Sequence, residues 1–244
     1  MVQQQSWSII IFAYNEEGNI LNTLLKTMHV LGLISPHDYE LIIVDDGSTD
    51  KTSNIIKDFI KDKKNIHSVF HKKNMGIGSA ILSGYKIASK DNVCALPADG
   101  QFNPEELIPF ASIPPHTIVS FYRKKKILYS PFRKLLTFFN KILNRYVLGI
   151  KIKDVNWVKI YKNEDLRKTN LAITSSLVES EICAKMLINN KELIEVESIY
   201  GARLYGKPKG ASFKIVRKAL LDVFILCIEI TRYKKVKKNK FTNT

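Results

Sequence analysis

The N-terminal half of the chain alternates short apolar runs with segments of helical periodicity, and this alternation most constrains the fold. Four Ile- and Val-rich runs are typical of strands that are buried on both faces, and they span residues 7–13, 39–44, 66–70 and 93–96. Between them, apolar residues recur every three or four positions, as in amphipathic helices. Because these intervals are too long for hairpins, the sequence predicts parallel βαβ units in a doubly wound α/β sheet flanked by helices. A fifth strand is expected at residues 117–121.

The composition indicates a folded chain with an anionic partner. The formal net charge is +15 over 244 residues, and 45% of the residues are apolar, which is enough for a substantial core. A folded chain this basic is typical of proteins that bind nucleic acid, a membrane surface or phosphorylated substrates. The positions of the basic residues along the chain distinguish these three kinds of partner.

The cysteines and the apolar segments indicate a cytoplasmic protein that meets membranes only at their surface. The three cysteines, Cys94, Cys183 and Cys227, form no CxxC pair, so neither a disulfide nor a zinc framework is expected. No stretch approaches the roughly 20 uncharged apolar residues that span a bilayer. The longest candidate, 219–230, contains two acidic residues. We therefore expect peripheral association with the membrane.

Polar residues follow the predicted strands where each strand ends. Asn15 and Glu16 follow the first strand, Asp46 the second, a loop ending in Gly76 the third, and Asp99 the fourth. Because the carboxyl ends of parallel strands share one edge of a sheet, these groups should lie together. There Asp46 could accept a hydrogen bond from a ribose or base, backbone N–H groups near Gly76 could meet phosphates, and Asp99 could hold a divalent cation.

The stretch 96–106 places a carboxylate and an amide on a short turn. Asp99 and Gln101 follow the fourth apolar run directly, and Asn103 is a typical N-cap with Glu106 as the partner of a capping box. Asp99-Gly100 could alternatively be no more than a turn into a capped helix.

Four ordered motifs resemble the GT-A glycosyltransferases of family 2. They are IIIFAYNEE at 9–17, VDDGSTD at 44–50, NMGIGSA at 74–80 and ADGQFNPE at 98–105. The resemblance implies a GT-A fold and a nucleotide-sugar donor, a GDP- or UDP-hexose, with Asp46 near the base and ribose. The donor contacts it implies are Ala13, Asn15, Glu16, Asp46, Gly76, Ala98 and Asp99.

The same resemblance implies a divalent cation, Mg²⁺ or Mn²⁺. Asp99 stands at the final carboxylate of the Asp-x-Asp metal motif of the family, and Gln101 is a candidate second ligand. The chain departs from the pattern at the first carboxylate, where Pro97 stands.

A basic amphipathic helix is predicted near residues 130–148. Residues 123–153 contain ten basic side chains and no acidic one, and this polarity favours an anionic surface such as a bilayer. The alternative is an ordinary helix packed on the sheet with a solvated basic face. The end of the chain again combines apolar and basic residues, because an apolar helix is predicted at 213–230 and basic residues follow it. This basic tail could anchor the chain at the membrane interface or be disordered and solvated.

The second half resembles one subgroup, the polyprenyl-phosphate transferases that are similar to dolichyl-phosphate mannose synthase. The matching motifs are SFYR at 120–123, PFRKL at 131–135, IKDVN at 152–156 and RLYGKPK at 203–209. The resemblance implies a role for Arg203 at the donor diphosphate or the acceptor phosphate, and it implies acceptor-phosphate contacts at Arg123, Arg133, Thr137 and Lys207. The chain departs from the subgroup at Asn156-Trp157-Val158. Asp154 could merely cap a turn, and Glu179 and Glu181 could lie on a helix surface.

Together these features predict a glycosyltransferase domain at 1–211 and an amphipathic helix with a basic tail at 212–244. We expect an inverting transfer of a hexose from a nucleotide sugar to a polyprenyl phosphate at the cytoplasmic membrane face, with Asp99, Arg123 and Arg203 as catalytic residues. An integral membrane partner could complete the enzyme. A saccharide hydroxyl acceptor and a non-catalytic nucleotide-sugar-binding relic are the alternatives. Nucleic-acid binding is not expected, because no aromatic stacking platform accompanies the charge.

Overall fold

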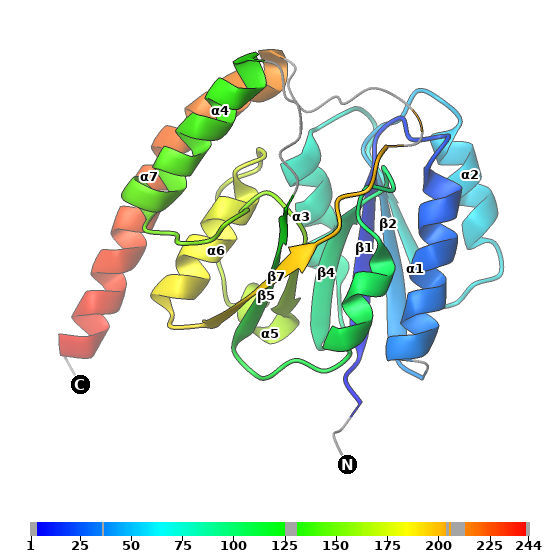
Figure 1. The fold of residues 1–244 in the computed structure, drawn as a ribbon, viewed down its shortest axis with the longest axis horizontal. Coiled ribbons are helices and arrows are strands. Elements are labelled where there is room, and N and C mark those ends of the chain that lie inside the picture. The colour runs from blue at the N-terminus through cyan, green and yellow to red at the C-terminus, as the bar shows by residue number, and fades with distance from the viewer. Residues whose placement is uncertain (1–3, 36, 125–130, 204, 206–212, 243–244) are drawn as a thin grey trace.

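The structure is a computed structural model that describes residues 4–35, 37–124, 131–203, 205 and 213–242, with the backbone alone described at 131–136, 213–220 and 240–242. Figure 1 shows a central sheet with helices on both faces. The strands are β1 Trp7–Ala13, β2 Tyr39–Asp45, β3 Ile66–Phe70, β4 Asn92–Pro97, β5 Thr117–Arg123, β6 Lys159–Lys162 and β7 Glu192–Ser198. The helices are α1 Ile20–Ile34, α2 Thr52–Ile60, α3 Ile77–Ile87, η1 Pro104–Phe110, α4 Pro131–Ile142, η2 Leu143–Leu148, α5 Asn163–Arg167, α6 Val178–Ile188 and α7 Phe213–Thr242.

The sheet has seven strands in the order β3-β2-β1-β4-β6-β5-β7. Strands β3, β2, β1 and β4 are parallel to one another, and β7 is parallel to β5. The short strand β6 runs antiparallel to both of its neighbours, β4 and β5. The predicted α/β architecture with a mostly parallel sheet is therefore confirmed.

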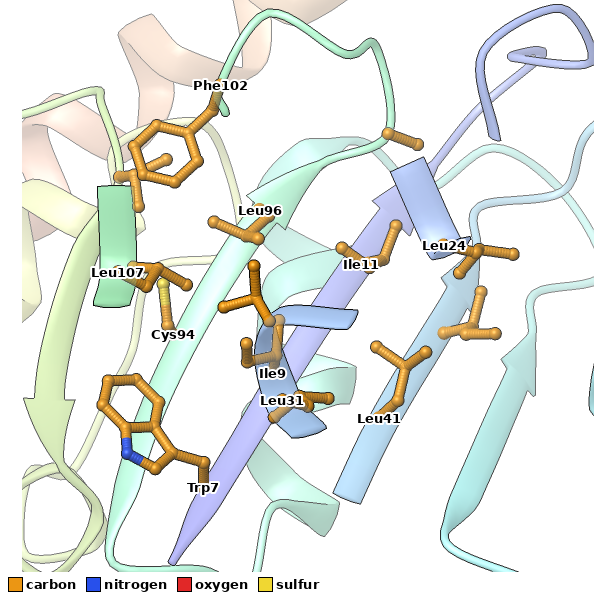
Figure 2. Packing of buried hydrophobic residues seen from close by; sticks show 14 of the residues in the cluster. Trp7, Ile9, Ile11, Leu24, Leu31, Leu41, Cys94, Leu96, Phe102 and Leu107 are labelled. Carbon is orange, nitrogen blue, oxygen red and sulfur yellow. The ribbon is translucent and has the colours of Figure 1, made fainter. Parts of the chain in front are cut away.

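Strand β1 is covered on both faces, as its run of isoleucines predicts. Ile9 and Ile11 point into one core with Leu24 and Leu31 of α1, and Figure 2 shows these side chains interdigitating. Ile10 points to the opposite side, into a second core built with α3 and α6. Because successive side chains of a strand alternate between faces, a strand between two helical layers has to be apolar throughout.

Several elements of the second half lie where the sequence predicts none, among them β6, α5 and β7. β6 has four residues, and β7 alternates glutamates with apolar residues at the edge of the sheet. Neither pattern resembles the continuous apolar runs of the first half. Polar residues are typical of an edge strand such as β7, whereas β6 lies between β4 and β5 and is too short to give a clear signal.

The alternative in which Glu179 and Glu181 lie on a helix surface is wrong. Both are buried in α6, at 8% and 0% exposure. Glu179 accepts hydrogen bonds from the hydroxyls of Tyr85 and Tyr161, at 3.1 and 2.5 Å. Glu181 accepts from Lys185 at 2.6 Å and from backbone N–H groups. These hydrogen bonds and the charge of Lys185 offset the free-energy cost of removing the two carboxylates from water, so both can be buried.

The predicted basic helix corresponds to α4 and its continuation η2, a π-helical turn. The C-terminal helix α7 is longer than expected, since it continues through the basic residues that were predicted as a tail after 230. Leu226 and Ile230 of α7 are buried against Leu143 of η2 and Leu177 and Cys183 near α6. Within the described ranges, no helix has the length and apolarity needed to cross a membrane. The division into domains at 211 stays a prediction.

Two glycines provide a matched test of the packing of α3 on β1. A Cβ on Gly84 would overlap the side chain of Ile10, whereas a Cβ on Gly32, in α1, would meet open space. We expect Gly84→Ala to lower the free energy of unfolding by about 1–3 kcal/mol, because it overpacks the core. We expect Gly32→Ala to raise it by about 0.5–1 kcal/mol, because alanine loses less backbone entropy in a helix. Urea denaturation measures both, and equal effects of the two changes would contradict the packing.

Candidate functional site

The loops that follow β1, β2 and β4 meet at one edge of the sheet because β1 pairs with both neighbours up to their ends. The register pairs Ala13 with Asp45 and Phe12 with Pro97. The ladder continues past the strands, since Asp46 N–H donates to the Ala13 carbonyl at 2.8 Å and Ala98 N–H donates to the Phe12 carbonyl at 3.0 Å. Ala13 and Ala98 are both buried, and their main chains take part in these hydrogen bonds, so the expected donor contacts at these two residues stay predictions.

Asp46 holds the glycine loop that leads into α3. Its Oδ1 accepts from Met75 N–H at 2.9 Å and lies 2.7 Å from Nδ1 of His71, and its Oδ2 accepts from Gly76 N–H at 2.8 Å. The side chain is buried. Gly76 has a φ of +94°, a conformation that favours glycine. Asp46 thus contacts the loop rather than an open cavity, and its expected role near base and ribose stays a prediction.

An open cleft of about 520 Å³ lies next to Asp46, at the ends of β1, β2 and β3. Its lining residues are Tyr14, Asp45, Gly47, Ser48, Thr49, Ser53, Lys57, Phe70, His71, Lys72, Lys73 and Asn74. Two aromatic rings and a carboxylate are the groups with which proteins recognise a base and its hydrogen-bonding edge. The sequence places both Asp45 and Asp46 at this edge, but the role near base and ribose was predicted for Asp46, and no role was predicted for Tyr14 or Phe70.

Strand alternation explains why Asp45 rather than Asp46 lines the cleft. Ile43 packs into the core on the α1 side and Val44 into the core on the α3 side. Asp45 and Asp46 continue this alternation to opposite sides. Asp46 therefore reaches the loop before α3, whereas the carboxylate of Asp45 accepts from Ser48 N–H at 3.0 Å and from the Ser53 hydroxyl.

Three residues from distant parts of the chain form an ion-pair cluster at the end of β4. The guanidinium Nη2 of Arg203 donates to Oε1 of Glu16 and lies 3.5 Å from Oδ2 of Asp99. Asp99 also accepts from Gln101 N–H through Oδ1, at 3.1 Å, and Glu16 accepts from Asn19 Nδ2 at 2.7 Å. All three charged side chains are less than one-fifth exposed, so their attraction is screened little by solvent.

The segment after β7 crosses the edge of the sheet to bring Arg203 there. Gly201 N–H donates to the Gln101 carbonyl at 2.8 Å, and Gln101 Nε2 donates back to the Gly201 carbonyl at 3.4 Å. Further on, the Tyr205 ring lies against Gly18, and its carbonyl accepts from Asn19 Nδ2 at 3.2 Å. Gln101, expected as a second metal ligand, thus has its amide nitrogen turned toward this segment.

Burial raises the pKa of the Asp99 carboxyl above its usual range. The hydrogen bond from Gln101 N–H and the charges of Arg203 and Arg123 oppose this effect.

Arg123 is fixed by a bidentate ion pair with Asp154. The Nε and Nη2 atoms of Arg123 donate to the two carboxylate oxygens of Asp154 at 2.7 and 3.0 Å. The guanidinium also lies over the rings of Trp157 and Tyr200, with its carbon 4.6 and 5.6 Å from the centroids. Asp154 therefore holds Arg123, one of the predicted catalytic residues, and the alternative that it merely caps a turn is wrong. Trp157, the departure from the subgroup pattern, provides the stacking surface.

Of the other residues predicted to contact the acceptor phosphate, the structure describes the side chain of Thr137 alone. Thr137 is exposed on α4. The side chain of Arg133 and the whole of Lys207 lie outside the described residues. Asn15, which has a φ of +53°, accepts from Thr49 N–H at 2.7 Å and so joins the loops that follow β1 and β2.

The donor set at Asp99 fits a hard divalent cation that is held largely by its substrate. No group of three His, Cys, Asp or Glu residues suited to a metal occurs in the part of the chain that the structure describes. Mg²⁺ commonly takes only one or two protein carboxylates and completes its shell with phosphates and water. The Asp99 carboxylate and the amide oxygen of Gln101 are ligands of that kind.

The model of the family described as "Glycosyl transferase family 2" matches residues 8–170, which include the cleft and the Asp99 turn. The chain belongs to this family. The predicted membership and the predicted glycosyltransferase activity are both confirmed. The matched segment ends before Arg203, so the family model does not include the arginine that closes the ion-pair cluster.

One curated relative of this family 2 glycosyltransferase is named for a polyprenyl-phosphate substrate. It is the undecaprenyl-phosphate 4-deoxy-4-formamido-L-arabinose transferase of Pectobacterium atrosepticum, 28% identical over 92% of this chain and 68% of the relative. The resemblance to the polyprenyl-phosphate subgroup is confirmed by this similarity.

Solved structures support the GT-A fold. A glucosyl-3-phosphoglycerate synthase from Mycobacterium tuberculosis in complex with Mn²⁺, UDP-glucose and phosphoglyceric acid has a TM-score of 0.60 at 18% identity, over 91% of this chain and 80% of that one. TarS of S. aureus in complex with UDP-GlcNAc has a TM-score of 0.61 at 18% identity, over 91% and 66%. At this identity the likeness concerns the fold.

The ion-pair cluster predicts how the titration of Asp99 responds to its neighbour. We expect Arg203→Gln to raise the pKa of Asp99 further, because it removes a positive charge and leaves Glu16 uncompensated nearby. A ¹³C NMR titration of labelled aspartate carboxyls measures this. Arg232→Gln, which removes an exposed partner of Glu229, is the matched control and should leave Asp99 unchanged. An unchanged or lowered pKa in Arg203→Gln would show that the two groups do not interact.

Proposed function

We propose that this family 2 glycosyltransferase transfers a sugar from a nucleoside diphosphate to a polyprenyl phosphate at the cytoplasmic face of the membrane, with inversion at the anomeric carbon. The observation that carries the proposal is the position of Arg203 between Glu16 and Asp99, with Arg123 stacked over Tyr200 of the segment that leads to Arg203. Two guanidiniums at the carboxyl edge of the sheet suit a reaction in which both substrates carry phosphate, because arginine recognises phosphate oxygens in pairs.

The donor fits the edge in two parts. The cleft with Tyr14, Asp45 and Phe70 takes the base and ribose, and the ion-pair cluster of Asp99 and Arg203 lies where the diphosphate would be held. Uridine is the first base to test, since TarS and the glucosyl-3-phosphoglycerate synthase, which share this fold, were solved in complex with UDP-sugars. The hexose predicted from the sequence stays a prediction, and the name of the curated relative adds a formamido-arabinose to the sugars to be tested.

A divalent cation belongs to this proposal. Asp99 and Gln101 would hold it, and when bound it neutralises charge on the leaving diphosphate. Arg203, which lies beside Asp99, would support the same leaving group. The chain's own groups thereby orient the diphosphate and exclude water from it.

The acceptor chemistry needs no strong base. A phosphate monoester has its second pKa at about 6, so one of its oxygens is a ready nucleophile at neutral pH. That oxygen forms a bond to the anomeric carbon while the bond from this carbon to the diphosphate oxygen breaks, and the nucleoside diphosphate leaves with the electron pair. Arg123, held by Asp154 and the Trp157 ring, is the group we assign to the acceptor phosphate.

A saccharide hydroxyl is the second candidate acceptor, and the raised pKa of Asp99 favours it. A hydroxyl must lose a proton as it attacks, and a carboxylate whose pKa is raised by burial is a better base. Against it, Asp99 is already paired with Arg203, which stabilises its ionised form. The acceptor assay below separates the two.

We expect the purified protein to form a glycolipid when it is given polyprenyl phosphate, Mg²⁺ or Mn²⁺ and the right nucleotide sugar. Asp99→Asn and Arg203→Gln should each lower turnover about a hundredfold or more, because both stabilise the leaving diphosphate. Asp58→Asn, an exposed change in α2, is the control and should have no effect. The readout is labelled sugar in the lipid extract. The proposal fails if the protein glycosylates a hydroxyl acceptor and leaves the lipid phosphate unchanged.

The lipid acceptor also requires contact with a membrane, and the side of the molecule with α4 and α7 suits it. Large apolar side chains are exposed on these helices and on η2, and they are Phe138, Phe139, Ile142, Tyr146, Val147, Leu221, Phe224, Ile225 and Ile228. Lys141 and Arg145 are exposed among them. Aromatic residues next to basic ones are typical of surfaces that bind anionic lipids, where each charge contributes about 1 kcal/mol.

We expect the protein to float with vesicles of phosphatidylglycerol and phosphatidylcholine. The double change Phe138→Ser with Phe139→Ser should weaken this association about tenfold or more, since it removes apolar area that the lipid would bury. Leu21→Ser with Leu25→Ser is the matched control, because these leucines are similarly exposed on α1, on the far side of the sheet in Figure 1. Equal losses in the two variants would contradict a specific membrane face.

A further inference from the structure

Lys159 is a buried lysine whose ammonium group lies against the backbone. The residue begins β6 and is 2% exposed. Its Nζ donates a hydrogen bond to the Trp157 carbonyl at 2.9 Å and another to the Val155 carbonyl. Because removing an ammonium group from water is costly, these hydrogen bonds have to offset a large free-energy cost.

Glu179 of α6 provides the opposite charge. Its Oε2 lies 3.7 Å from Lys159 Nζ. The same oxygen accepts a hydrogen bond from the Tyr161 hydroxyl, and Oε1 accepts one from the Tyr85 hydroxyl. Replacing a buried ion pair by well-packed apolar side chains is often neutral or even stabilising. Stability alone therefore does not account for a lysine at this position.

The two carbonyls that Lys159 binds belong to the segment that holds Arg123. Asp154 directly precedes Val155, and its carboxylate forms the bidentate ion pair with Arg123. The ring of Trp157 lies against the same guanidinium. Without the ammonium group, two buried carbonyls would lose a charged donor, and the segment would have to move to regain partners. Such a movement would displace both groups that hold Arg123.

We propose that Lys159 is a positioning residue for Arg123 and, through it, for the acceptor phosphate. It acts by fixing the backbone of residues 155–157, from which the Asp154 carboxylate and the Trp157 ring reach the guanidinium. Its own side chain is 1% exposed and is too deeply buried to touch a substrate. The inference rests on the proposed function in one respect, that Arg123 binds the acceptor phosphate.

Lys185 provides a matched control. Its side chain is 3% exposed and is paired with Glu181 of α6 at 2.6 Å, and its Nζ also donates to the Asn170 carbonyl. Both lysines are thus buried, paired with a glutamate of α6 and bound to a backbone carbonyl. Lys185 contacts Asn170 and the ring of Tyr233 in α7 rather than the segment 154–157. A loss that is specific to Lys159 therefore cannot be ascribed to the removal of a buried charge as such.

The first measurement follows Arg123 itself. The exchange of its Nε–H with water is followed by ¹⁵N NMR, and the signal is assigned by its absence in Arg123→Gln. We expect Lys159→Met to speed this exchange about tenfold or more, because the hydrogen bond from Nε to Asp154 opens more often. Lys185→Met should leave the rate within about twofold of the wild type, because it acts on a separate segment. Equal acceleration in the two variants overturns the inference, since a general loss of stability would cause it.

A paired variant keeps the test decisive if Lys159→Met does not fold. Lys159→Met combined with Glu179→Gln removes both charges, so no buried carboxylate is left without its counter-charge. The two carbonyls still lack their donor, and we expect the exchange of the Arg123 Nε–H to stay fast. A rate equal to that of the wild type in this paired variant overturns the inference, since Lys159 would then serve only to balance Glu179.

The second measurement is the binding of farnesyl phosphate, a short polyprenyl phosphate, with UDP and GDP for comparison. We expect Lys159→Met to weaken binding of farnesyl phosphate about three- to tenfold, the effect of loosening one charged contact, and to leave binding of the nucleoside diphosphates unchanged. In Arg123→Gln the same change should cause no further loss, because both changes act through one contact. Losses that simply add up overturn the inference.

The outcome is separate from that of the proposed function. A wild type that binds no farnesyl phosphate, or binds it no better than Arg123→Gln does, refutes the assignment of Arg123 to the acceptor phosphate. The exchange measurement needs no substrate, so it still decides whether Lys159 positions Arg123.

Discussion

The architecture depends on β1 being paired along both edges and covered on both faces. Its backbone groups are satisfied by β2 on one side and β4 on the other, and its isoleucines enter two separate cores. This leaves no freedom in register, because a shift of one residue would turn every isoleucine to the wrong face. The ends of the three strands are therefore fixed at one level. The residues that follow them form a site because the core has already aligned their backbones.

The site itself depends on charges that compensate one another in a partly buried place. Burying Glu16 or Asp99 alone would be costly, and a guanidinium between them offsets that cost. The same compensation explains why the segment after β7 folds back over the edge of the sheet, since it supplies the guanidinium. Arginine suits the position better than lysine, because its planar group offers several donors and can serve two carboxylates at once.

The part of the fold that could be predicted is the part where one apolar run corresponds to one buried strand. β1, β2, β4 and β5 belong to it. β7 could not be predicted in this way, because it alternates glutamates with apolar residues at the sheet edge. Asp99 and Arg203 could be predicted from motifs, but their contact could not, since it depends on how a segment a hundred residues later crosses the sheet.

Asp45 and Asp46 show a further limit of motif reasoning. A motif identifies the pair, and the alternation of the strand assigns the two residues to different sides. The side to which each aspartate points follows from Ile43 and Val44, because side chains of a strand alternate between its two faces. This can be used only once it is known which helix covers each face of the sheet. The same holds for Asp154, whose role depends on Arg123 lying opposite it.

The charges of the site also bear on Pro97. Glu16, Asp99 and Asp154 face the two guanidiniums of Arg123 and Arg203, which leaves one formal negative charge in excess before any substrate arrives. A nucleoside diphosphate sugar brings further negative charge to the same place, so additional positive charge has to accompany it. A divalent cation at Asp99 meets this requirement. A second carboxylate in the place of Pro97 would add a ligand for that cation and also one more charge to neutralise. With proline there, a cation bound as we propose would be held more by the phosphates of the donor than by the protein, and its binding would be coupled to the binding of the donor.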